Sequence, residues 1–412
     1  MKRISALTAV LALVLVACGD GEEGGEATTA PTGTEAPTDT EAPEGTDAPE
    51  DTEPPPEGVQ AAADACELGE TDGDLNLYNW TEYVPTGSLA EEFEVTDLVA
   101  KFEDEYGVEV VLTEYESNEA MLAQIDAGVG YDLVVPSDYM VSIMKDAGLL
   151  VQLNKDAIPN MSNIAELFSD PPYDAGNEFS APYQWGTTGI GYKYGTIDDE
   201  EGVSWAVLFD QEVAEPNAGL ISLLDDERET MGSALKYLGY SLNTTNPDEV
   251  DEAAALIAEA KEWVAAFTSS GYWDLLTAGE VNLAQGWNGD FLAAYDSAST
   301  EDYDAYEDFG YAIPVEGSAA WVDTMAIPST AEHPCTSHAF IDFMLDAENG
   351  AELTNYNYYA SPNAAAEEMI YEEILEDPSI YPPEDVMQTL EFFEDLGDFA
   401  TYYADSYAAA KS

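Results

Sequence analysis

The chain has 412 residues, of which 85 are acidic and 10 are Lys or Arg, so its formal charge is −75. With 45% hydrophobic and 11% aromatic residues, it is predicted to be globular and long enough for two domains. So few basic residues exclude a surface that follows nucleic-acid phosphates, and an anionic membrane surface would repel the chain. The charge favours a cationic ligand, a saline habitat, or both.

The N-terminus has the pattern of a secretory signal. Lys2 and Arg3 precede an apolar run over residues 4–17, which is too short for a permanent membrane span and predicts a signal peptide at residues 1–17. The run ends in Leu15-Val16-Ala17-Cys18, which resembles the bacterial lipobox, whose cysteine is diacylated and becomes the first mature residue. The alternative is an ordinary signal peptide that happens to contain a cysteine. We expect an extracytoplasmic protein that meets the cell membrane only through lipid on Cys18.

Residues 18–74 are predicted to be a disordered linker. Residues 19–74 contain 18 acidic residues and no Lys or Arg, and a Thr/Pro motif recurs every six residues from Thr34. Proline and like charges keep such a chain extended, so it would hold the folded part away from the membrane. The rest of the chain is itself strongly acidic, which we interpret as a solvated surface with only a few carboxylates involved in binding.

Strands and helices alternate after the linker. Strands are predicted at residues 75–80, 108–112 and 132–136, and helices at 98–106 and 120–127. Asn246-Pro247 opens a further helix whose apolar residues recur at spacings of three and four as far as Phe267. This alternation predicts an α/β fold of two lobes, with the ligand in the cleft between them.

Motifs of common enzymes are missing from the sequence, which contains neither a phosphate-binding P-loop nor a Gly-x-Ser-x-Gly nucleophile elbow. Its two histidines, His333 and His338, flank Cys335 in a pattern that could bind a metal, but Pro334 and the missing fourth ligand argue against this. We therefore expect no catalysis, no cofactor and no metal. If Cys18 carries lipid, Cys66 and Cys335 are the remaining thiols of an oxidising compartment, and a disulfide between them is the preferred interpretation.

Aromatic residues stand beside carboxylates at several predicted strand ends. The segments are 78–85, 134–139, 224–229, 287–290 and 321–323. An aliphatic cation with ammonium groups at its ends needs this mixture, because ring faces attract its methylenes and ammonium groups while carboxylates accept charge-assisted hydrogen bonds. A buried ammonium without such partners would cost several kcal/mol. These segments therefore predict a cleft for an organic cation.

Motifs in the same order, from about Leu75 almost to the C-terminus, resemble the spermidine/putrescine-binding proteins of polyamine ABC transporters. The segments that carry the resemblance are 78–85, 114–119, 131–137, 181–186, 225–229, 279–283 and 287–289. The resemblance implies a monomeric periplasmic-binding-protein fold of type II, which closes on its ligand by a hinge and delivers it to a permease. The two crossings between lobes would fall near Gly186 and Trp321. The lobes would then be residues 75–186 with 321–367, and residues 187–320 with 368–412.

The resemblance also implies roles for individual residues. Trp80 and Tyr83 match aromatic and hydroxyl contacts at one end of the ligand, and Asp323 matches the carboxylate that holds its inner ammonium. Asp226 and Glu229 match the acidic pair that takes a terminal ammonium. The other matched positions are Thr81 and Glu82 beside Trp80, Ser137 and Tyr139 in the second loop of the first lobe, Ser269 at a water-mediated contact, Trp287 and Trp321 on the polyamine stem, Asp290 after Trp287, and Tyr359 near the cleft floor.

Two positions bear on selectivity. Asp290 matches the putrescine-preferring members, whereas Trp321 and the pair Asp226 and Glu229 match the spermidine type. Phe393 stands where spermidine binders place a Gln and cannot hydrogen-bond an ammonium. Because four cleft carboxylates are balanced better by three ligand charges than by two, we favour spermidine over putrescine.

Other hypotheses remain at this point. A protein of this fold could bind another small cation or present a polyamine to a sensor. A glycoside hydrolase would also place Trp beside Asp and Glu, but it would turn over a sugar. A ligand with a carboxylate would need an arginine, and the only arginine after the signal, Arg228, is expected to pair with Asp226 or Glu229.

Overall fold

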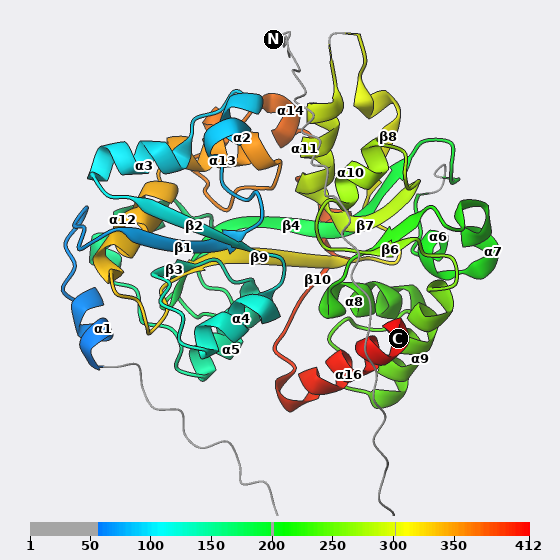
Figure 1. Ribbon diagram of the computed structural model, residues 1–412, viewed down its shortest axis with the longest axis horizontal. Coiled ribbons are helices and arrows are strands. Elements are labelled where there is room, and N and C mark those ends of the chain that lie inside the picture. Colours follow the sequence, from blue (N-terminus) through cyan, green and yellow to red (C-terminus); the bar gives the residue numbers. More distant parts are fainter. Residues whose placement is uncertain (1–56, 199–201, 301) are drawn as a thin grey trace, which may run out of the picture. The chain divides into compact units, whose positions relative to one another are not determined.

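The computed structural model describes residues 57–412 apart from 199–201 and 301, and its centre is one mixed β-sheet (Figure 1). Ten strands of the described residues join it in the order β2-β1-β3-β9-β4-β7-β5-β6, with β8 beside β4 and β10 beside β9. The strands are β1 Leu75–Trp80, β2 Val110–Tyr115, β3 Leu133–Val134, β4 Ser180–Lys193, β5 Ile221–Leu223, β6 Ala266–Phe267, β7 Leu283–Trp287, β8 Phe309–Ala312, β9 Ala319–Ala326 and β10 Glu391–Phe392.

The two halves of this sheet meet at the long strand β4. Residues 180–187 of β4 pair antiparallel with β9, whereas residues 188–192 pair antiparallel with β7. In the first half β1 runs parallel to β2 and β3, and in the second half β5 runs parallel to β6 and β7. The two positions at which we expected the chain to cross, Gly186 and Trp321, face each other in the register of β4 and β9. The limits of the two lobes themselves stay a prediction.

Helices cover both faces of each half of the sheet. In the view of Figure 1, α2, α3 and α13 lie above the first half and α4 and α5 below it, while α10 and α11 lie above the second half and α8, α9 and α16 below it. The helices are α1 Glu57–Ala63, α2 Gly87–Glu92, α3 Leu98–Tyr106, α4 Asn118–Asp126, α5 Asp138–Asp146, α6 Ala206–Phe209, α7 Gln211–Ala214, α8 Glu227–Leu238, α9 Pro247–Ala260, α10 Tyr272–Thr277, α11 Asn288–Ala298, α12 Pro334–Met344, α13 Ala347–Asn357, α14 Glu372–Leu375, α15 Glu384–Met387 and α16 Ala400–Lys411. The fold class is therefore the predicted α/β layering of sheets and helices.

Local signals account for the elements that were predicted well. Strand β1 forms at the predicted residues and buries Leu75 and Leu77 against the core, although Tyr78 and Asn79 are buried as well. Helix α3 begins where the Asp97 side chain accepts a hydrogen bond from the Ala100 N–H, and it ends at Gly107, whose φ of 70° suits glycine. Both elements occupy the predicted residues because their start and stop signals lie within a few positions of the chain.

The helix that we expected to continue to Phe267 ends earlier. Asn246 caps α9 and Pro247 occupies its first turn, but the helix stops at Ala260. Phe267 belongs instead to β6, where it faces Leu223 of β5 in a parallel ladder. The apolar spacing was consistent with a longer helix, but pairing with β5, which is distant in the chain, places these residues in a strand.

The last part of the predicted linker, residues 57–74, belongs to the described structure and is not a disordered segment. Residues 57–63 form α1, Ala63 is fully buried, and the Gln60 side chain hydrogen-bonds both the N–H and the carbonyl of Gln152. The segment is held by contacts to distant residues, which its acidic composition cannot reveal. The predicted signal peptide, the lipidation site Cys18 and the linker as far as residue 56 lie outside the described residues.

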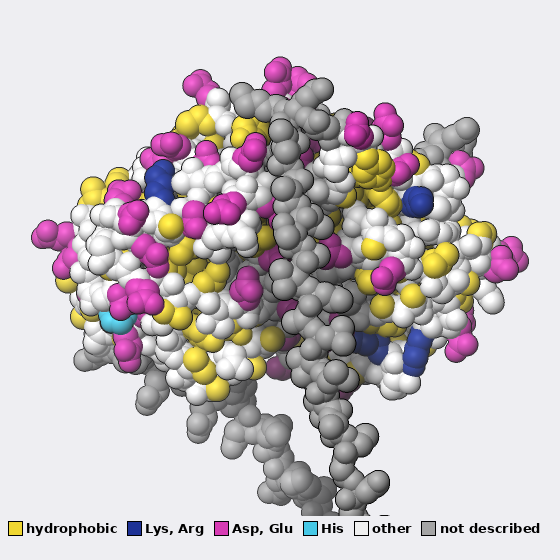
Figure 2. All heavy atoms as spheres, turned by 45° about the horizontal axis from the view of Figure 1, so that its top comes forward, with side chains coloured by type: hydrophobic (Ala, Val, Ile, Leu, Met, Phe, Trp, Pro, Cys, Tyr) yellow, Lys and Arg dark blue, Asp and Glu magenta, His cyan; other side chains and the backbone are white. Residues whose placement is uncertain are grey.

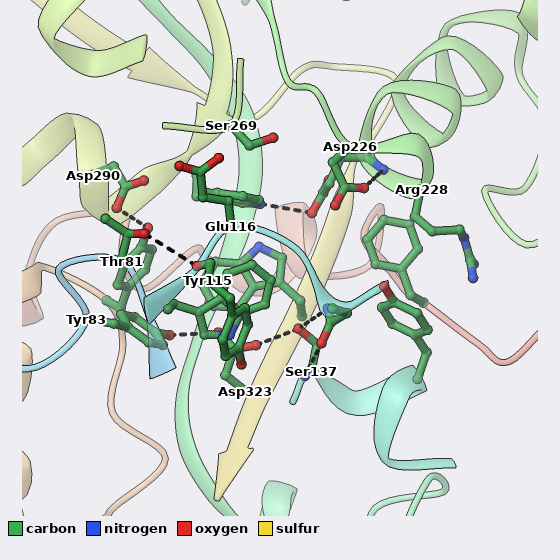
Figure 3. Close-up of a pocket in the computed structure, with 18 of the residues that line it drawn as sticks. Thr81, Tyr83, Tyr115, Glu116, Ser137, Asp226, Arg228, Ser269, Asp290 and Asp323 are labelled. Carbon is green, nitrogen blue, oxygen red and sulfur yellow. Dashed lines mark hydrogen bonds between the residues drawn. The ribbon is translucent and has the colours of Figure 1, made fainter. Parts of the chain in front are cut away.

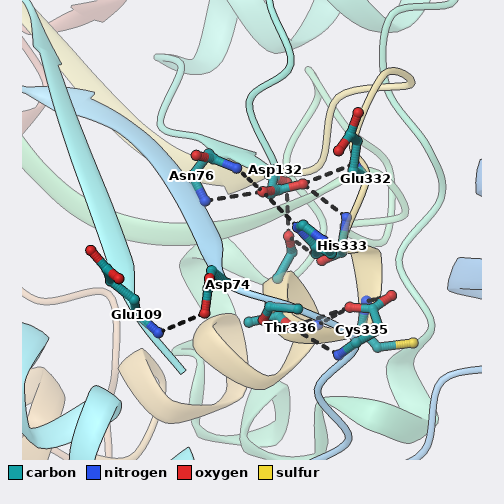
Figure 4. Close-up of polar contacts among 11 residues, drawn as sticks. Asp74, Asn76, Glu109, Asp132, Glu332, His333, Cys335 and Thr336 are labelled. Atoms are coloured by element: carbon teal, nitrogen blue, oxygen red, sulfur yellow. Dashed lines mark hydrogen bonds and ion pairs between the residues drawn. The ribbon is translucent and has the colours of Figure 1, made fainter. Parts of the chain in front are cut away.

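A disulfide and a buried carboxylate hold this N-terminal segment to α12. Cys66 and Cys335 are bonded, with their Cα atoms 5.2 Å apart. Nearby, fully buried Asp132 accepts hydrogen bonds from the N–H and side-chain amide of Asn76 and from the N–H groups of Glu332 and His333 (Figure 4). The disulfide thus ties Cys66 to a residue 269 positions away. Asp132 ties the start of strand β1 to the residues just before α12.

The surface is acidic, as the composition requires. Figure 2 shows Asp and Glu side chains spread over the visible face, with few Lys or Arg side chains between them. Within residues 57–412, the described helices include none that is both long and apolar enough to span a bilayer.

Candidate ligand-binding site

A cavity that is partly open to solvent lies where the two halves of the sheet meet. Its walls come largely from the loops that follow the carboxyl ends of β1, β2, β3, β5, β6 and β7, which is the usual position of a binding site in parallel sheets. The lining residues are Trp80, Thr81, Tyr83, Tyr115, Glu116, Asn118, Ser137, Tyr139, Asp226, Arg228, Glu229, Ser269, Trp273, Trp287, Asp290, Trp321, Asp323, Tyr359 and Phe393. Every predicted ligand-binding residue except Glu82 is among them.

Asp323 is the central carboxylate of the first half. It lies on β9, is 5% exposed, and accepts hydrogen bonds from the Tyr83 hydroxyl at 2.9 Å and the Ser137 hydroxyl at 2.6 Å (Figure 3). Asn118 holds Ser137 in turn, because its Oδ1 accepts from the Ser137 N–H at 3.1 Å. Burial raises the pKa of Asp323 to about 7, although the two hydroxyls lower it in part. A cation beside Asp323 would stabilise its ionised form.

Aromatic rings from both halves meet above this carboxylate. Trp80, at the end of β1, is fixed by a hydrogen bond from its Nε1 to the Val135 carbonyl at 2.9 Å. Its ring lies 5.9 Å from the ring of Trp287, at the end of β7 in the other half. Two rings that converge in this way provide apolar walls for methylene groups and ring faces for ammonium groups.

The acidic pair of the second half is built at the start of α8. Asp226 caps this helix, since its Oδ1 accepts a hydrogen bond from the Glu229 N–H at 3.0 Å. Glu229 accepts from the Trp287 Nε1 at 3.0 Å through one oxygen, while its other oxygen, Oε2, is buried and has no hydrogen-bond partner among the described residues. Burial is the main cause that raises the pKa of each carboxyl. A donor group of a ligand would satisfy this unpaired acceptor.

Asp290 is held by two tyrosine hydroxyls. Tyr272 donates to its Oδ2 at 2.5 Å and Tyr359 donates to its Oδ1 at 2.6 Å. Burial raises the pKa of Asp290 to about 6, and both hydroxyls oppose this rise. The Tyr272 hydroxyl also accepts a hydrogen bond from the Trp287 N–H at 3.0 Å. Tyr272 therefore positions two cavity residues, although it does not line the cavity, and no motif in the sequence singled it out.

Besides Glu229, two predicted contact residues have buried polar atoms without a partner among the described residues. They are the hydroxyl of Ser269, after β6, and the Nε1 of Trp321, on β9. The Trp321 ring packs edge-on to Tyr359 at 5.1 Å, and a Cβ on Gly186 would lie 2.7 Å from it. Glycine is thus required opposite Trp321, where β4 passes between the two halves.

Arg228 does not form the expected ion pair with Asp226 or Glu229. Its guanidinium donates to the Glu394 carbonyl at 3.1 Å and to Asn243 Oδ1 at 3.0 Å. The same group lies over the rings of Phe393 at 5.0 Å and Tyr139 at 5.1 Å. The backbone near Phe393 and its ring hold the guanidinium away from the acidic pair. The contact between Arg228 and Phe393 could not be deduced from the sequence, because the two residues are far apart in the chain.

The structure differs from the prediction in a few other lining residues. Glu82 lies outside this cavity, with a φ of 54°, and its N–H donates to Glu114 at 2.9 Å. Tyr115, Glu116 and Asn118 line the cavity without having been assigned a role, although they lie in the segment 114–119 that carried part of the resemblance. Trp273 also lines the cavity, and no sequence motif indicated this. The first turn of α10 reaches the cavity only because of the way the chain folds.

Neither histidine lines the cavity, and both make hydrogen bonds that hold the fold together. The His338 Nδ1 faces the Pro334 carbonyl at 2.6 Å and its Nε2 accepts from the Asn154 N–H at 2.9 Å, while His333 contacts Asp132. Across the residues that the structure describes, no three His, Cys, Asp or Glu side chains are grouped so that they could hold a metal ion. The cavity therefore combines several acidic groups, aromatic rings and one arginine at its edge.

Comparisons with known proteins show which family the chain belongs to. The family described as bacterial extracellular solute-binding protein matches residues 97–381. The putrescine/cadaverine-binding protein of Pseudomonas aeruginosa is 36% identical over 78% of this chain and 88% of its own length. The spermidine/putrescine-binding periplasmic protein of Escherichia coli is 33% identical over 85% and 97%, respectively. The solved structure of a Treponema pallidum lipoprotein is 32% identical, with a TM-score of 0.67 over 82% of this chain and 99% of that one. The chain belongs to the bacterial extracellular solute-binding proteins.

Proposed function

We propose that the protein captures a polyamine in this cavity, with spermidine favoured over putrescine, and delivers it to the permease of an ABC transporter. The names of its curated relatives, which are binding proteins for putrescine, cadaverine or spermidine, support this class of ligand. The chain is thus a carrier of solute rather than an enzyme.

One observation carries the proposal: four carboxylates that are buried or half-buried share a single cavity with aromatic rings. They are Asp226, Glu229 and Asp323, each less than one tenth exposed, and Asp290, which is half-buried. Burial raises the pKa of all four, so their ionised forms are unfavourable in the empty cavity. A ligand that brings ammonium groups supplies the missing opposite charge, and its methylenes pack against the rings.

The arrangement of these carboxylates supports spermidine over putrescine. Two tyrosine hydroxyls already satisfy Asp290, whereas the buried Oε2 of Glu229 has no partner in the part of the chain that the structure describes. Three ammonium groups leave less unpaired negative charge among four carboxylates than two do. The triamine is therefore the better electrostatic match.

Attachment to the membrane is part of the same proposal. We infer that Cys18 carries lipid, which is supported by the sequence pattern before it and by similarity to a lipoprotein of Treponema pallidum. Replacement of Cys18 by Ala should release the protein from the membrane fraction of expressing cells without a change in ligand affinity. A variant that stays in the membrane fraction would contradict the anchor.

Calorimetric titration of the purified protein with putrescine and spermidine, at low and at high salt, tests the ligand. One-to-one binding that survives high salt, and is tighter for spermidine, is the expected result, because buried ion pairs are screened weakly. Weak binding to many sites that disappears in high salt would mean that the acidic surface alone attracts polycations, and the proposal would fail.

A further inference from the structure

A second cavity, with about 1060 Å³ of open space, adjoins the first. The two share four lining residues, namely Thr81, Trp273, Asp290 and Tyr359. They therefore meet at one end of the first cavity, beside Asp290. No predicted role was assigned to this space.

The two ends of the first cavity differ in charge. Figure 3 shows Asp226 and Arg228 at one end and Thr81 and Asp290 at the other. The guanidinium of Arg228, stacked on Phe393, makes the first end unfavourable for a further cation. A cationic chain that is longer than the first cavity is therefore expected to extend past Asp290, where the described lining contains no Lys or Arg.

The second cavity continues the chemistry of the first. Its carboxylates come from both sides, with Glu82 and Glu92 from the first half and Asp274 from α10. Burial raises the pKa of Glu82, and repulsion from Glu114, then from Asp274 and Glu92, adds to this effect. No Lys or Arg is among the described residues that line this space. The three carboxylates, all of them exposed, thus line one space without a balancing cation in its described lining.

The walls of the second cavity also suit a chain of methylenes. Ala293, Ala294 and Ala298 of α11 form an apolar side, and Phe93 and Tyr356 add two rings. Asn357 also lines this cavity; it is 5% exposed, and its Nδ2 has no hydrogen-bond partner among the described residues. A buried donor without a partner can be satisfied by a water that hydrates an incoming ammonium.

We infer that the site accepts a linear polyamine that passes Asp290, so that a fourth ammonium group lies among Glu82, Glu92 and Asp274. The inference rests on the proposed function and extends the ligand class from triamines to tetra-amines such as spermine. A divalent metal fits less well, because the described side chains include no cluster that could coordinate one. An extended organic cation, in contrast, needs only carboxylates that are spread along its length.

The test uses putrescine and spermine as probes of the short and the extended ligand. The variant carries Glu92→Gln and Asp274→Asn, which remove two charges from the second cavity and leave the first cavity unchanged. The matched control carries Glu259→Gln and Glu262→Gln, two exposed charges at the end of α9. Thermal unfolding of both variants should match that of the unaltered protein, because all four positions are exposed.

Calorimetry should show that the Glu92 and Asp274 variant binds spermine about tenfold more weakly, while its putrescine affinity and both affinities of the control stay within about twofold. Equal losses for the two amines, or no loss for spermine, would overturn the inference while leaving the proposed function intact. If the unaltered protein bound no polyamine in its cavity, the proposed function would fail as well, so the two failures are distinguishable.

Discussion

Replacing Asp323 by Asn should weaken ligand binding and at the same time stabilise the unliganded protein at alkaline pH. The substitution keeps the size of the side chain and removes its charge. Asp323 is 5% exposed and accepts hydrogen bonds from Tyr83 and Ser137, so it is held in place whether or not a ligand is bound. The two expected effects have opposite signs and come from the same buried charge.

The loss of affinity follows from the ion pair. An ammonium buried beside Asp323 would lose its charged partner, which costs ~2 to 5 kcal/mol in comparable pairs. This corresponds to a rise in the dissociation constant of about 30-fold to several thousand-fold. The effect should be seen at pH 8, where the carboxylate of the unaltered protein is ionised.

The gain in stability follows from the raised pKa. Burial raises the pKa of Asp323 from 3.8 to about 7. Because the unfolded chain releases this proton at lower pH than the folded chain, the group makes the folded state less stable as pH rises from about 4 to 7. The full effect is roughly 4 kcal/mol above pH 7. Asn avoids this cost but loses about 1 kcal/mol of hydrogen bonding, so a net gain of about 2 to 3 kcal/mol is expected at pH 8.

Calorimetry and thermal unfolding at pH 4.5 and pH 8 test both effects. Asp174→Asn is the matched control, because Asp174 is 1% exposed and its Oδ2 accepts three hydrogen bonds from Phe179 and Ser180, away from the cavity. The control should lose stability and keep its affinity. Unchanged affinity in Asp323→Asn would remove Asp323 from the site, and lower stability at pH 8 would refute the argument from burial.

Four further predictions concern the site and the disulfide. Trp287→Ala should weaken binding by ~1 to 3 kcal/mol in calorimetry, because the ring contacts of the ligand are lost. Tyr272→Phe should weaken binding more at pH 6 than at pH 8. Loss of this hydrogen-bond donor raises the pKa of Asp290 further, so less of the carboxyl is ionised at pH 6. Equal losses of affinity at both pH values would argue against this role of Tyr272. In the unaltered protein, the affinity for the ligand should rise between about pH 5 and 8, because bound ammonium groups favour ionised carboxyls. Calorimetric titrations in buffers of different ionisation enthalpy should detect the protons that are released on binding. Joint replacement of Cys66 and Cys335 by Ser should lower the free energy of unfolding by ~2 to 5 kcal/mol, measured in urea, and leave the affinity unchanged.

Much of the fold could be predicted because its signals are local. The alternation of Leu75 and Leu77 marks β1, and the cap at Asp97 with Gly107 at the other end marks α3. The side chains that follow strand ends could also be assigned to one site, because carboxyl ends of parallel strands meet at the same edge of a sheet. Resemblance to a family added the role of each of these side chains.

Contacts between distant parts of the chain decided the rest. Phe267 lies in a strand because Leu223 pairs with it, and residues 57–74 are ordered because Cys66 and Gln60 bind residues far along the chain. Arg228 stacks on Phe393, more than 160 positions away, rather than pairing with its neighbours in sequence.

The sequence by itself determined the composition of the site, because the charge, the rings and their places after strands are properties of short segments. Only the tertiary structure decided which groups share which cavity: it set Tyr272 behind Asp290, placed Glu82 outside the first cavity, and brought Glu92 and Asp274 together from opposite halves. Burial and mutual repulsion shift the pKa of a carboxyl through its neighbours in space, and those neighbours come from segments that only folding brings into contact.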